Sequence, residues 1–405
     1  MNSFNPEPID VVTSVPSSKS ILARLMILGA LSDGRCVFDN AVLSDDTKTM
    51  LVCLRTLGFN INYKEETKQL RITGENGKIP KSQAEIYVGN AGTAARFLTA
   101  MLSFSEGEYI IRASERMSER PMKDLLDSLR NAGVNILCLE KEGYFPIKIN
   151  GKKFTEPVEI SIDVSKSTQF ASAVILCGSL LPEGSKCIRV NEGRNSYIRM
   201  TEKLVDRFGK HMLVESDWSS AAYCFSAAAV LGGRVKVKNI QLDSVQGDSK
   251  IAELLTKMGG SFSEDKEGVT VEFKKSIVGT ALDFDEDMSD YSDQSMTLAT
   301  LGALLNGTTT IKNIGHIRLQ ECDRINALYE NFLTLGIKCT CTKDSITVTG
   351  GNVGVGMIKA ENDHRIAMSF GLLKLVNPDI EIDNPDCVKK TFPGYNSFMS
   401  SLRQQ

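Results

Sequence analysis

Amphipathic helices that end at a glycine recur along the chain. Five segments place apolar residues at helical spacing, reach a glycine and then enter a short run typical of a strand: "MLVCLRTLGFNI", "LLDSLRNAGVNI", "KLVDRFGKHM", "AELLTKMGGSF" and "YENFLTLGIKC". Glycine suits the left-handed conformation that caps a helix. The closing glycines are Gly58, Gly133, Gly209, Gly259 and Gly336. The pattern predicts helices packed beside short strands.

The spacing of these glycines indicates a repeat. Successive intervals are 75, 76, 50 and 77 residues, and a last helix near "YNSFMSSLRQQ" supplies a sixth unit. A period near 75 residues favours a repeated α/β module, although chance resemblance between helix ends is the alternative. The short interval follows Gly209, where "KHMLVESDWSS" runs almost directly into the next helix. We therefore expect the third unit to be shortened by two strands.

Length and composition describe a folded, soluble chain. Its 405 residues exceed what one core usually organises, so we expect two domains of roughly 150 to 220 residues. The apolar fraction of 42% and the charged fraction of 24% are ordinary for globular proteins. The N-terminus lacks a basic segment followed by an apolar one, and no apolar run is long enough to span a bilayer. We expect a cytoplasmic monomer that binds no membrane.

Charge and cysteine content argue against two classes of function. The net charge of −3 lacks the basic excess of a nucleic-acid-binding protein. Ten cysteines occur without any CxxC pair, and Cys339 and Cys341 alternate on an expected strand. We interpret the cysteines as reduced core residues and predict no structural metal.

Four polar stretches stand where helices are expected to start. Backbone N–H groups and the helix dipole favour anions at such positions. The stretches are "VPSSKSILAR", "GNAGTAARF", "SERMSERPMKDLLDSL" and "SKSTQF". Their candidate donors are Lys19, Ser20, Arg24, Asn90, Gly92, Thr93, Arg96, Arg116, Arg120, Ser167, Thr168 and Gln169. Each stretch taken alone is equally consistent with a capped helix whose cations are solvated.

Acidic residues form a second set near the C-terminal half. They are Asp293 in "SDYSDQSMT", Glu321 and Asp323 in "LQECDRI", and Asp363 in "NDHR". Arg324, His364 and Arg365 accompany them. Acids at helix starts are commonly caps, which is the alternative interpretation of Asp323 and Asp363. His364 has an equally plain alternative as a hydrogen-bonded histidine.

Taken in order, these segments resemble the 5-enolpyruvylshikimate-3-phosphate (EPSP) synthases, the 3-phosphoshikimate 1-carboxyvinyltransferases. The resemblance runs from Lys19 to "KKTFPGY" near residue 395. The matching motifs are "SKS", "NAGTA", "RM.ERP", "S.STQF", "YI.MT", "SSAAY", "QGD", "SDQSMT", "ECDR", "NDHR" and "KTFP".

The resemblance implies a two-domain inside-out α/β barrel. Each domain would contain three βαβαββ-like units, which fits the observed period. Residues 1–17 and 246–405 would form the first domain and residues 18–245 the second, with the active site in the cleft between them.

The resemblance also implies a reaction without cofactor or metal. The enolpyruvyl group of phosphoenolpyruvate would move to the 5-hydroxyl of shikimate 3-phosphate through a tetrahedral intermediate, with release of phosphate. This is a step in chorismate and aromatic amino-acid biosynthesis. The two small-molecule substrates carry about six negative charges, so the site needs cations.

By the same resemblance, the catalytic residues would be Asp293, which binds the substrate hydroxyls and acts as base, and Glu321 and Lys19, which exchange protons. Shikimate 3-phosphate would contact Lys19, Ser20, Arg24, Ser167, Thr168, Gln169, Tyr197, Asp293 and Gln320. Phosphoenolpyruvate would contact Lys19, Asn90, Gly92, Thr93, Arg96, Arg120, Gln169, Arg324, His364, Arg365 and Lys390. His364 would orient an arginine or a carboxylate.

The chain departs from the family pattern at a few positions. Gln320 stands where a lysine is usual, and Arg194 stands where a serine is usual. Phe97 replaces a common proline beside the expected phosphoenolpyruvate pocket, so sensitivity to glyphosate, which occupies that pocket in the family, is left open.

Two other functions are considered. One is the sister enolpyruvyl transferase acting on UDP-N-acetylglucosamine, which typically carries a reactive cysteine on a loop; here residues 101–137 contain none. The other is a non-catalytic binding protein of the same fold.

Overall fold

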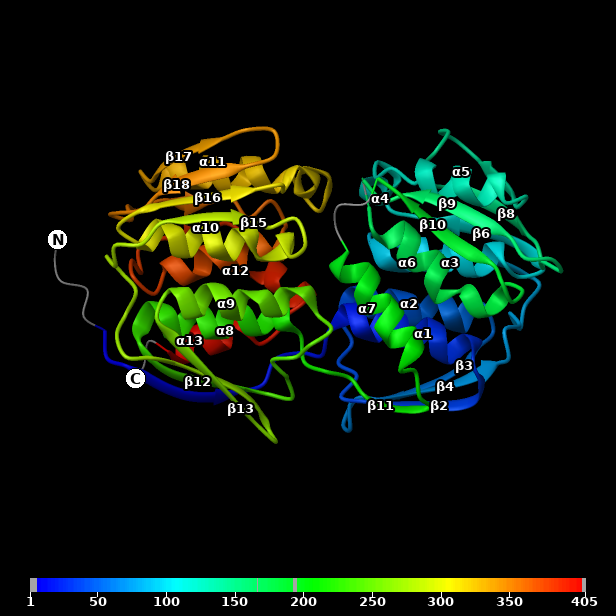
Figure 1. The fold of residues 1–405 in the computed structure, drawn as a ribbon, viewed down its shortest axis with the longest axis horizontal. Helices are drawn as coiled ribbons and strands as arrows, with labels where there is room; N and C mark the ends of the chain where they lie inside the picture. Colours follow the sequence, from blue (N-terminus) through cyan, green and yellow to red (C-terminus); the bar gives the residue numbers. More distant parts are fainter. Residues whose placement is uncertain (1–5, 166, 192–194, 403–405) are drawn as a thin grey trace. The chain divides into compact units, whose positions relative to one another are not determined.

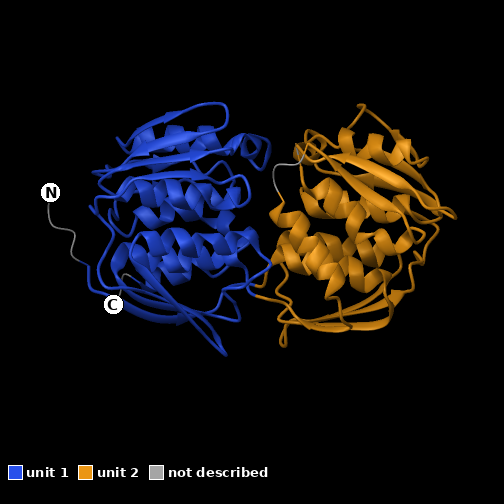
Figure 2. Cartoon of the chain, viewed as in Figure 1, with its two compact units in different colours: residues 1–16, 216–405 blue, residues 17–215 orange. Residues whose placement is uncertain are grey.

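The chain forms two compact units in the computed structural model, which describes residues 6–165, 167–191 and 195–402 (Figure 2). Unit 1 comprises residues 1–16 and 216–405, and unit 2 comprises residues 17–215. The second crossing was predicted between residues 245 and 246 but lies between 215 and 216. The reason is that residues 233–238 form a strand hydrogen-bonded to residues 9–13 of unit 1.

Four sheets share one strand pattern. In order across each sheet, the first two strands are parallel, the second and third are antiparallel, and the third and fourth are antiparallel. In unit 2 the sheets are β11(His211–Leu213)-β2(Asp33–Asp39)-β4(Gln69–Glu75)-β3(Asn60–Lys64) and β5(Gln83–Tyr87)-β6(Gly107–Arg112)-β8(Ile147–Gly151)-β7(Asn135–Cys138).

Unit 1 repeats that pattern twice (Figure 1). Its sheets are β1(Ile9–Thr13)-β12(Gly233–Lys238)-β14(Gly268–Phe273)-β13(Gly260–Asp265) and β15(Phe284–Asp287)-β16(Thr308–Lys312)-β18(Ile346–Thr349)-β17(Lys338–Cys341). The recurrence of one strand order in four sheets confirms the predicted α/β repeat.

A third, smaller sheet completes each unit. It contains two parallel strands: β9(Glu159–Asp163) and β10(Lys186–Val190) in unit 2, and β19(Met357–Ile358) and β20(Glu381–Ile382) in unit 1. Neither small sheet includes an antiparallel hairpin among the described residues, and in unit 2 the strand β11 joins β2. The shortening expected for the third unit stays a prediction, because the small sheet of unit 1 has the same two-stranded form.

The helices connect these strands. In unit 2 they are α1(Lys19–Leu31), α2(Asp45–Thr56), α3(Gly92–Ser103), α4(Glu115–Ser118), α5(Lys123–Asn131), α6(Gln169–Leu176) and α7(Ser196–Asp206). In unit 1 they are α8(Trp218–Leu231), α9(Ile251–Lys257), α10(Ser295–Leu304), α11(Arg324–Thr334), α12(His364–Leu373) and α13(Tyr395–Ser401). Short 3₁₀ turns η1(Gly178–Leu180), η2(Gly247–Lys250), η3(Ser292–Gln294), η4(Gly315–Leu319) and η5(Pro385–Lys390) complete the described elements.

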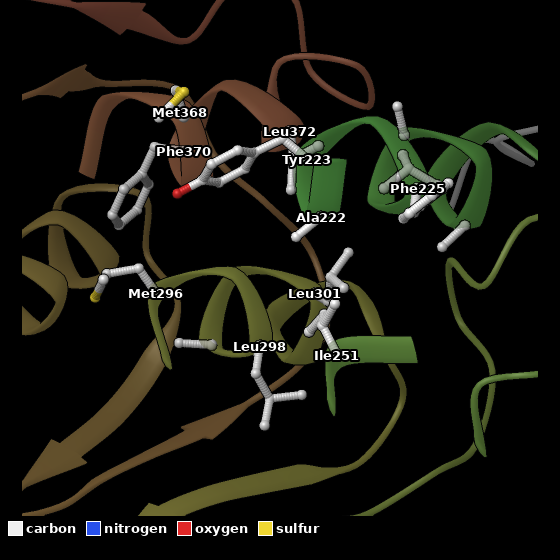
Figure 3. Close-up of a cluster of buried hydrophobic side chains, with 14 of the residues drawn as sticks. Ala222, Tyr223, Phe225, Ile251, Met296, Leu298, Leu301, Met368, Phe370 and Leu372 are labelled. Atoms are coloured by element: carbon white, nitrogen blue, oxygen red, sulfur yellow. The ribbon is translucent and has the colours of Figure 1, made fainter. Parts of the chain in front are cut away.

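Three helices in each unit form its core. In unit 1 these are α8, α10 and α12, and every residue of α10 and α12 is buried. A helix that is apolar on all sides requires such burial. Figure 3 shows Ala222 of α8, Leu301 of α10 and Phe370 of α12 among the packed side chains. In unit 2 the helices α1, α3 and α6 contact one another in the same way. Because packing on all sides fixes the position of these helices, it also fixes the backbone of the polar residues in their first turns.

Four of the five predicted glycine caps are confirmed. Gly58, Gly133, Gly259 and Gly336 have φ angles of 98°, 96°, 103° and 70° and lie two residues after the last helical residue. The prediction for Gly209 is wrong, because α7 ends at Asp206 and Gly209 lies three residues later without a left-handed φ.

Candidate functional site

One arginine in unit 1 donates hydrogen bonds to three carboxylates. Arg324, the first residue of α11, donates from Nε to Asp363 Oδ2 at 2.7 Å. Its Nη1 donates to Asp293 Oδ1 at 3.0 Å, and its Nη2 donates to Glu321 Oε2 at 2.9 Å. Burial opposes the charge of Arg324, but Asp363, Glu321 and Asp293 outweigh it and raise its pKa above the usual range. Arg324 is therefore a charged guanidinium that holds three carboxylates named from the sequence in fixed positions.

Asp293 bridges two arginines. Its Oδ1 accepts from Arg324, and its Oδ2 accepts from Arg365 Nη2 at 3.0 Å. Arg365 Nη1 also donates to the backbone oxygen of Asp293 at 3.3 Å. The 3₁₀ turn η3 carries Asp293, and α12 carries Arg365. Both oxygens of this carboxylate are thus oriented by charged donors, which are stronger than neutral ones.

Glu321 joins this group to a lysine. Its Oε2 accepts from Arg324, and its Oε1 lies 3.4 Å from Lys390 Nζ. The side chains of Glu321 and Lys390 are 18% and 20% exposed, so water reaches both. A carboxylate and an ammonium side by side and partly solvated are suited to exchanging a proton with a ligand.

Asp363 explains the arrangement at the start of α12. It is the N-cap, and its Oδ1 accepts from the backbone N–H of Arg365 at 2.8 Å. The same carboxylate holds Arg324. Asp363 was named in the acidic set with a helix cap as its alternative interpretation, and the structure gives it both the cap and the contact with Arg324. His364 is 1% exposed, and its Nδ1 lies 3.9 Å from Asp363 Oδ1.

Gln320 fits the arginine-rich surroundings of unit 1. Its Oε1 accepts from Arg324 Nη1, so the amide oxygen faces a positive charge. The lysine that is usual here in the resembled family would bring a second cation to Arg324. Arg194, a second departure from the family pattern, lies outside the described residues.

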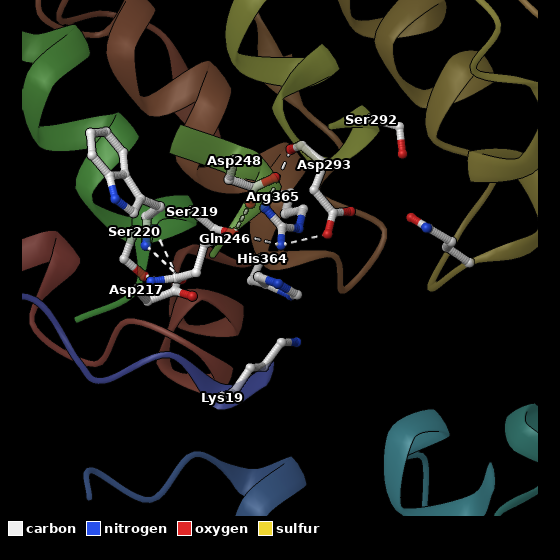
Figure 4. Close-up of polar contacts among 12 residues, drawn as sticks. Lys19, Asp217, Ser219, Ser220, Gln246, Asp248, Ser292, Asp293, His364 and Arg365 are labelled. Carbon is white, nitrogen blue, oxygen red and sulfur yellow. Dashed lines mark hydrogen bonds and ion pairs between the residues drawn. The ribbon is translucent and has the colours of Figure 1, made fainter. Parts of the chain in front are cut away.

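Ser219 and Asp248 extend the cluster and were not predicted. Ser219 Oγ accepts from Arg365 Nη2 at 3.1 Å and donates to Asp248 Oδ2. Burial, followed by the negative charge of Asp293, raises the pKa of Asp248 to about 6. Figure 4 shows Ser219, Asp248, Asp293 and Arg365 pointing toward one another.

Arg24 is a buried brace in unit 2. It donates from Nε to Thr201 Oγ1 at 2.7 Å, from Nη1 to the backbone oxygen of Ser20 at 2.8 Å, and from Nη2 to that of Tyr197 at 3.2 Å. Burial lowers its pKa to about 10. Arg24 thus links two other predicted site residues, Ser20 on α1 and Tyr197 on α7.

A second group gathers at the first turn of α3. Arg96 Nη1 donates to Gln169 Oε1 at 2.5 Å, and Gln169 Nε2 donates to Thr93 Oγ1 at 3.4 Å. A Cβ on Gly92 would lie 2.7 Å from Arg96 Nη1 and 3.0 Å from Arg120 Nη1. Two guanidinium groups therefore lie against the N-terminus of α3, which by itself favours anions.

The remaining predicted residues of unit 2 lie at helix starts. Lys19 is the first residue of α1, and its Nζ lies 3.3 Å from Asp46 Oδ2. Thr168 is the N-cap of α6, Ser167 Oγ accepts from the backbone N–H of Gln169 at 3.3 Å, and Asn90 is exposed just before α3.

The described part of the chain lacks two kinds of feature. It contains no group of three or more His, Cys, Asp or Glu side chains arranged to hold a metal ion. None of its helices combines the length and apolarity that a membrane crossing requires.

The comparisons with known proteins agree along the chain. The family model for EPSP synthase (3-phosphoshikimate 1-carboxyvinyltransferase) matches residues 5–212 and 209–399. The 3-phosphoshikimate 1-carboxyvinyltransferase of Trichormus variabilis is 33% identical, over 96% of this chain and 95% of its own length. The 3-phosphoshikimate 1-carboxyvinyltransferase of Salmonella schwarzengrund is 36% identical, over 98% of this chain and 97% of its own length.

A solved structure shares the fold. The EPSP synthase of Acinetobacter baumannii superposes with a TM-score of 0.80 at 24% identity, over 98% of this chain and 96% of that one. With the motifs, the repeated sheets and the sequence relatives in agreement, this chain belongs to the EPSP synthase family.

Proposed function

We propose that this chain transfers the enolpyruvyl group of phosphoenolpyruvate to the 5-hydroxyl of shikimate 3-phosphate and releases phosphate. Membership of the EPSP synthase family supports the reaction. The bridging of Asp293 between Arg324 and Arg365 is the observation that carries the mechanism, because it fixes a carboxylate with both oxygens oriented.

The proposed reaction requires three proton transfers. In the addition step, the 5-hydroxyl loses a proton as its oxygen bonds to C2 of phosphoenolpyruvate, and C3 gains a proton to give the tetrahedral intermediate. In elimination, a proton leaves the new methyl group as the C2–O bond to phosphate breaks. One group must therefore act as base toward the hydroxyl, and another must give and later retrieve a proton at carbon.

Asp293 is the proposed base. Two arginines orient its oxygens, and the carboxylate is 15% exposed, so a hydroxyl can approach it. Glu321, beside Lys390, is proposed to exchange the proton at carbon together with Lys19. A positioned acid or base contributes typically about 10² to 10⁴ in rate.

Substrate binding is divided between the two groups of residues. We assign the anionic groups of phosphoenolpyruvate to Arg96, Arg120 and the first turn of α3, assisted by Lys19, Arg324, Arg365 and Lys390. Shikimate 3-phosphate is assigned to Ser20, Ser167, Thr168, Gln169, Tyr197 and Gln320, with Arg24 holding Ser20 and Tyr197. Guanidinium forks match both phosphate and carboxylate.

A phosphate-release assay tests the proposal. The purified chain should release phosphate from phosphoenolpyruvate only when shikimate 3-phosphate is added. Turnover with UDP-N-acetylglucosamine instead would identify the sister transferase. Binding of both substrates without turnover would identify a non-catalytic relative.

A further inference from the structure

A four-residue chain of contacts leads away from Asp293 into unit 1. Asp293 Oδ2 accepts from Arg365 Nη2 at 3.0 Å, and the same nitrogen donates to Ser219 Oγ at 3.1 Å. Ser219 in turn donates its proton to Asp248 Oδ2. Asp248 lies in η2, Ser219 in α8, Asp293 in η3 and Arg365 in α12, so four separate elements meet (Figure 4).

The direction of these hydrogen bonds follows from the charges. An ionised Asp248 can only accept, so Ser219 must give it the hydroxyl proton. The oxygen of Ser219 then presents its lone pairs to Arg365, which can only donate. Asp248 thus determines how Ser219 faces Arg365.

Asp248 and Asp293 also interact through their charges. Asp248 is 5% exposed, and the groups that face it are Asp293, Arg365, Ser219 and Asp217, the N-cap of α8. Interacting acids that share one cation titrate as a pair. While Asp248 is ionised, it draws on the positive charge of Arg365 and disfavours a second negative charge on Asp293.

A plain structural role for Asp248 is the simplest alternative, since its bond to Ser219 joins η2 to α8. A neutral side chain could make that bond as well. An ionised carboxylate in so buried a place carries a desolvation penalty, which a joining role does not require. Asp248 therefore affects Asp293 through its negative charge and not through its hydrogen bond to Ser219.

We propose that Asp248 and Ser219 are positioning residues that raise the proton affinity of Asp293 through Arg365. The proposal rests on the role of Asp293 as base in the proposed function. Asp248 keeps Arg365 from neutralising Asp293 fully, and Ser219 keeps Arg365 Nη2 between the two acids. Neither residue touches substrate in this account.

The test is the pH profile of kcat for Asp248→Asn. The amide keeps the size of the side chain and an oxygen that accepts from Ser219, but it removes the charge. Asp293 should become a weaker base, so the acidic limb of the profile should move down by about one pH unit, and kcat on the plateau should fall about tenfold. KM for both substrates should change less than about threefold.

Two further variants separate a catalytic effect from a structural one. Ser219→Ala should move the acidic limb in the same direction, and the double variant should lose little more than either single one, because the two residues act as one unit. Asp265→Asn is the matched control, since this exposed acid of β13 pairs only with surface groups in its described contacts. Its profile should match the parent.

The outcomes distinguish this inference from the proposed function. An unshifted acidic limb in Asp248→Asn and Ser219→Ala, with cooperative unfolding intact, overturns the inference alone. Fully additive losses in the double variant also overturn it. Full turnover in Asp293→Asn would remove the proposed base, and with it the basis of this inference.

Discussion

Arg324 and Asp363 form a buried ion pair, with Nε and Oδ2 separated by 2.7 Å and side chains that are 2% and 0% exposed. The pair joins the first turn of α11 to the cap of α12. Loss of Asp363 would leave the buried Nε of Arg324 without its acceptor, and Asp293 and Glu321 would offset only part of the charge. The pair therefore supports both the fold of unit 1 and the orientation of Asp293.

Asp363→Ala should destabilise the protein strongly. It removes a partner of Arg324 and the N-cap of α12, and breaking a buried pair costs about 3–5 kcal/mol. Urea unfolding followed by circular dichroism measures the change. Asp363→Asn keeps a capping oxygen, so its free energy of unfolding should fall clearly less than that of Asp363→Ala. A loss below about 1 kcal/mol in the alanine variant, the range of an ordinary substitution, would contradict the role given to this pair.

Gly92→Ala should weaken phosphoenolpyruvate binding. The added Cβ would lie 2.7 Å from Arg96 Nη1 and 3.0 Å from Arg120 Nη1, so both guanidinium groups must move. We expect KM for phosphoenolpyruvate to rise about tenfold, which corresponds to about 1.4 kcal/mol of lost binding. Gly178→Ala is the control, because a Cβ there meets nothing within 4 Å. Equal KM values in the two variants would refute the anion site at α3.

Asp293→Ala and Glu321→Ala should lower turnover far more than they weaken substrate binding. We expect kcat to fall about 10² to 10⁴-fold, the usual contribution of a positioned acid or base. Steady-state kinetics and calorimetric titration with shikimate 3-phosphate separate the two effects. An unchanged rate in either variant would exclude that acid from the mechanism.

Arg120→Ala should act in the opposite sense. Because Arg120 is assigned to binding, its loss should chiefly raise KM for phosphoenolpyruvate and leave kcat within about tenfold of the parent value. A collapse of kcat at saturating phosphoenolpyruvate would show that Arg120 acts in the chemical step instead.

Asp248 should make the protein more stable in mild acid relative to its asparagine variant. Burial, then Asp293, raises its folded pKa to about 6 from 3.8, so between these values the folded state binds the extra proton. Stability from this group is present at low pH and is lost as pH rises through about 6. The free energy of unfolding, measured with urea at pH 4.5 and pH 7, should therefore fall with rising pH by on the order of 2 kcal/mol more in the parent than in Asp248→Asn. A constant difference between the two proteins would contradict the raised pKa.

The sequence predicted the features that depend on local chemistry. Glycines such as Gly58 and Gly336 marked helix ends, and their spacing indicated the repeated α/β module. Asp293, Glu321, Arg324 and Arg365 stood in short polar motifs, and the structure brings them together in unit 1.

Features set by contacts between distant segments were missed. Ser219 and Asp248 lie in the quoted motifs "SSAAY" and "QGD", but they were given no role because nothing local shows that they meet Arg365. The second crossing was placed too late because the pairing of β12 with β1, which assigns that segment to unit 1, joins residues far apart in the chain. Asp363 looked like a cap, and its hold on Arg324 depends on the packing of α11 beside α12.

Mass spectrometry of the reaction mixture tests the central claim most directly. Incubation of the chain with phosphoenolpyruvate and shikimate 3-phosphate should give inorganic phosphate and one product that is shikimate 3-phosphate bearing an enolpyruvyl group, and Asp293→Ala should give almost none. Recovery of both substrates unchanged from the parent protein, under conditions in which it binds them, would contradict the account.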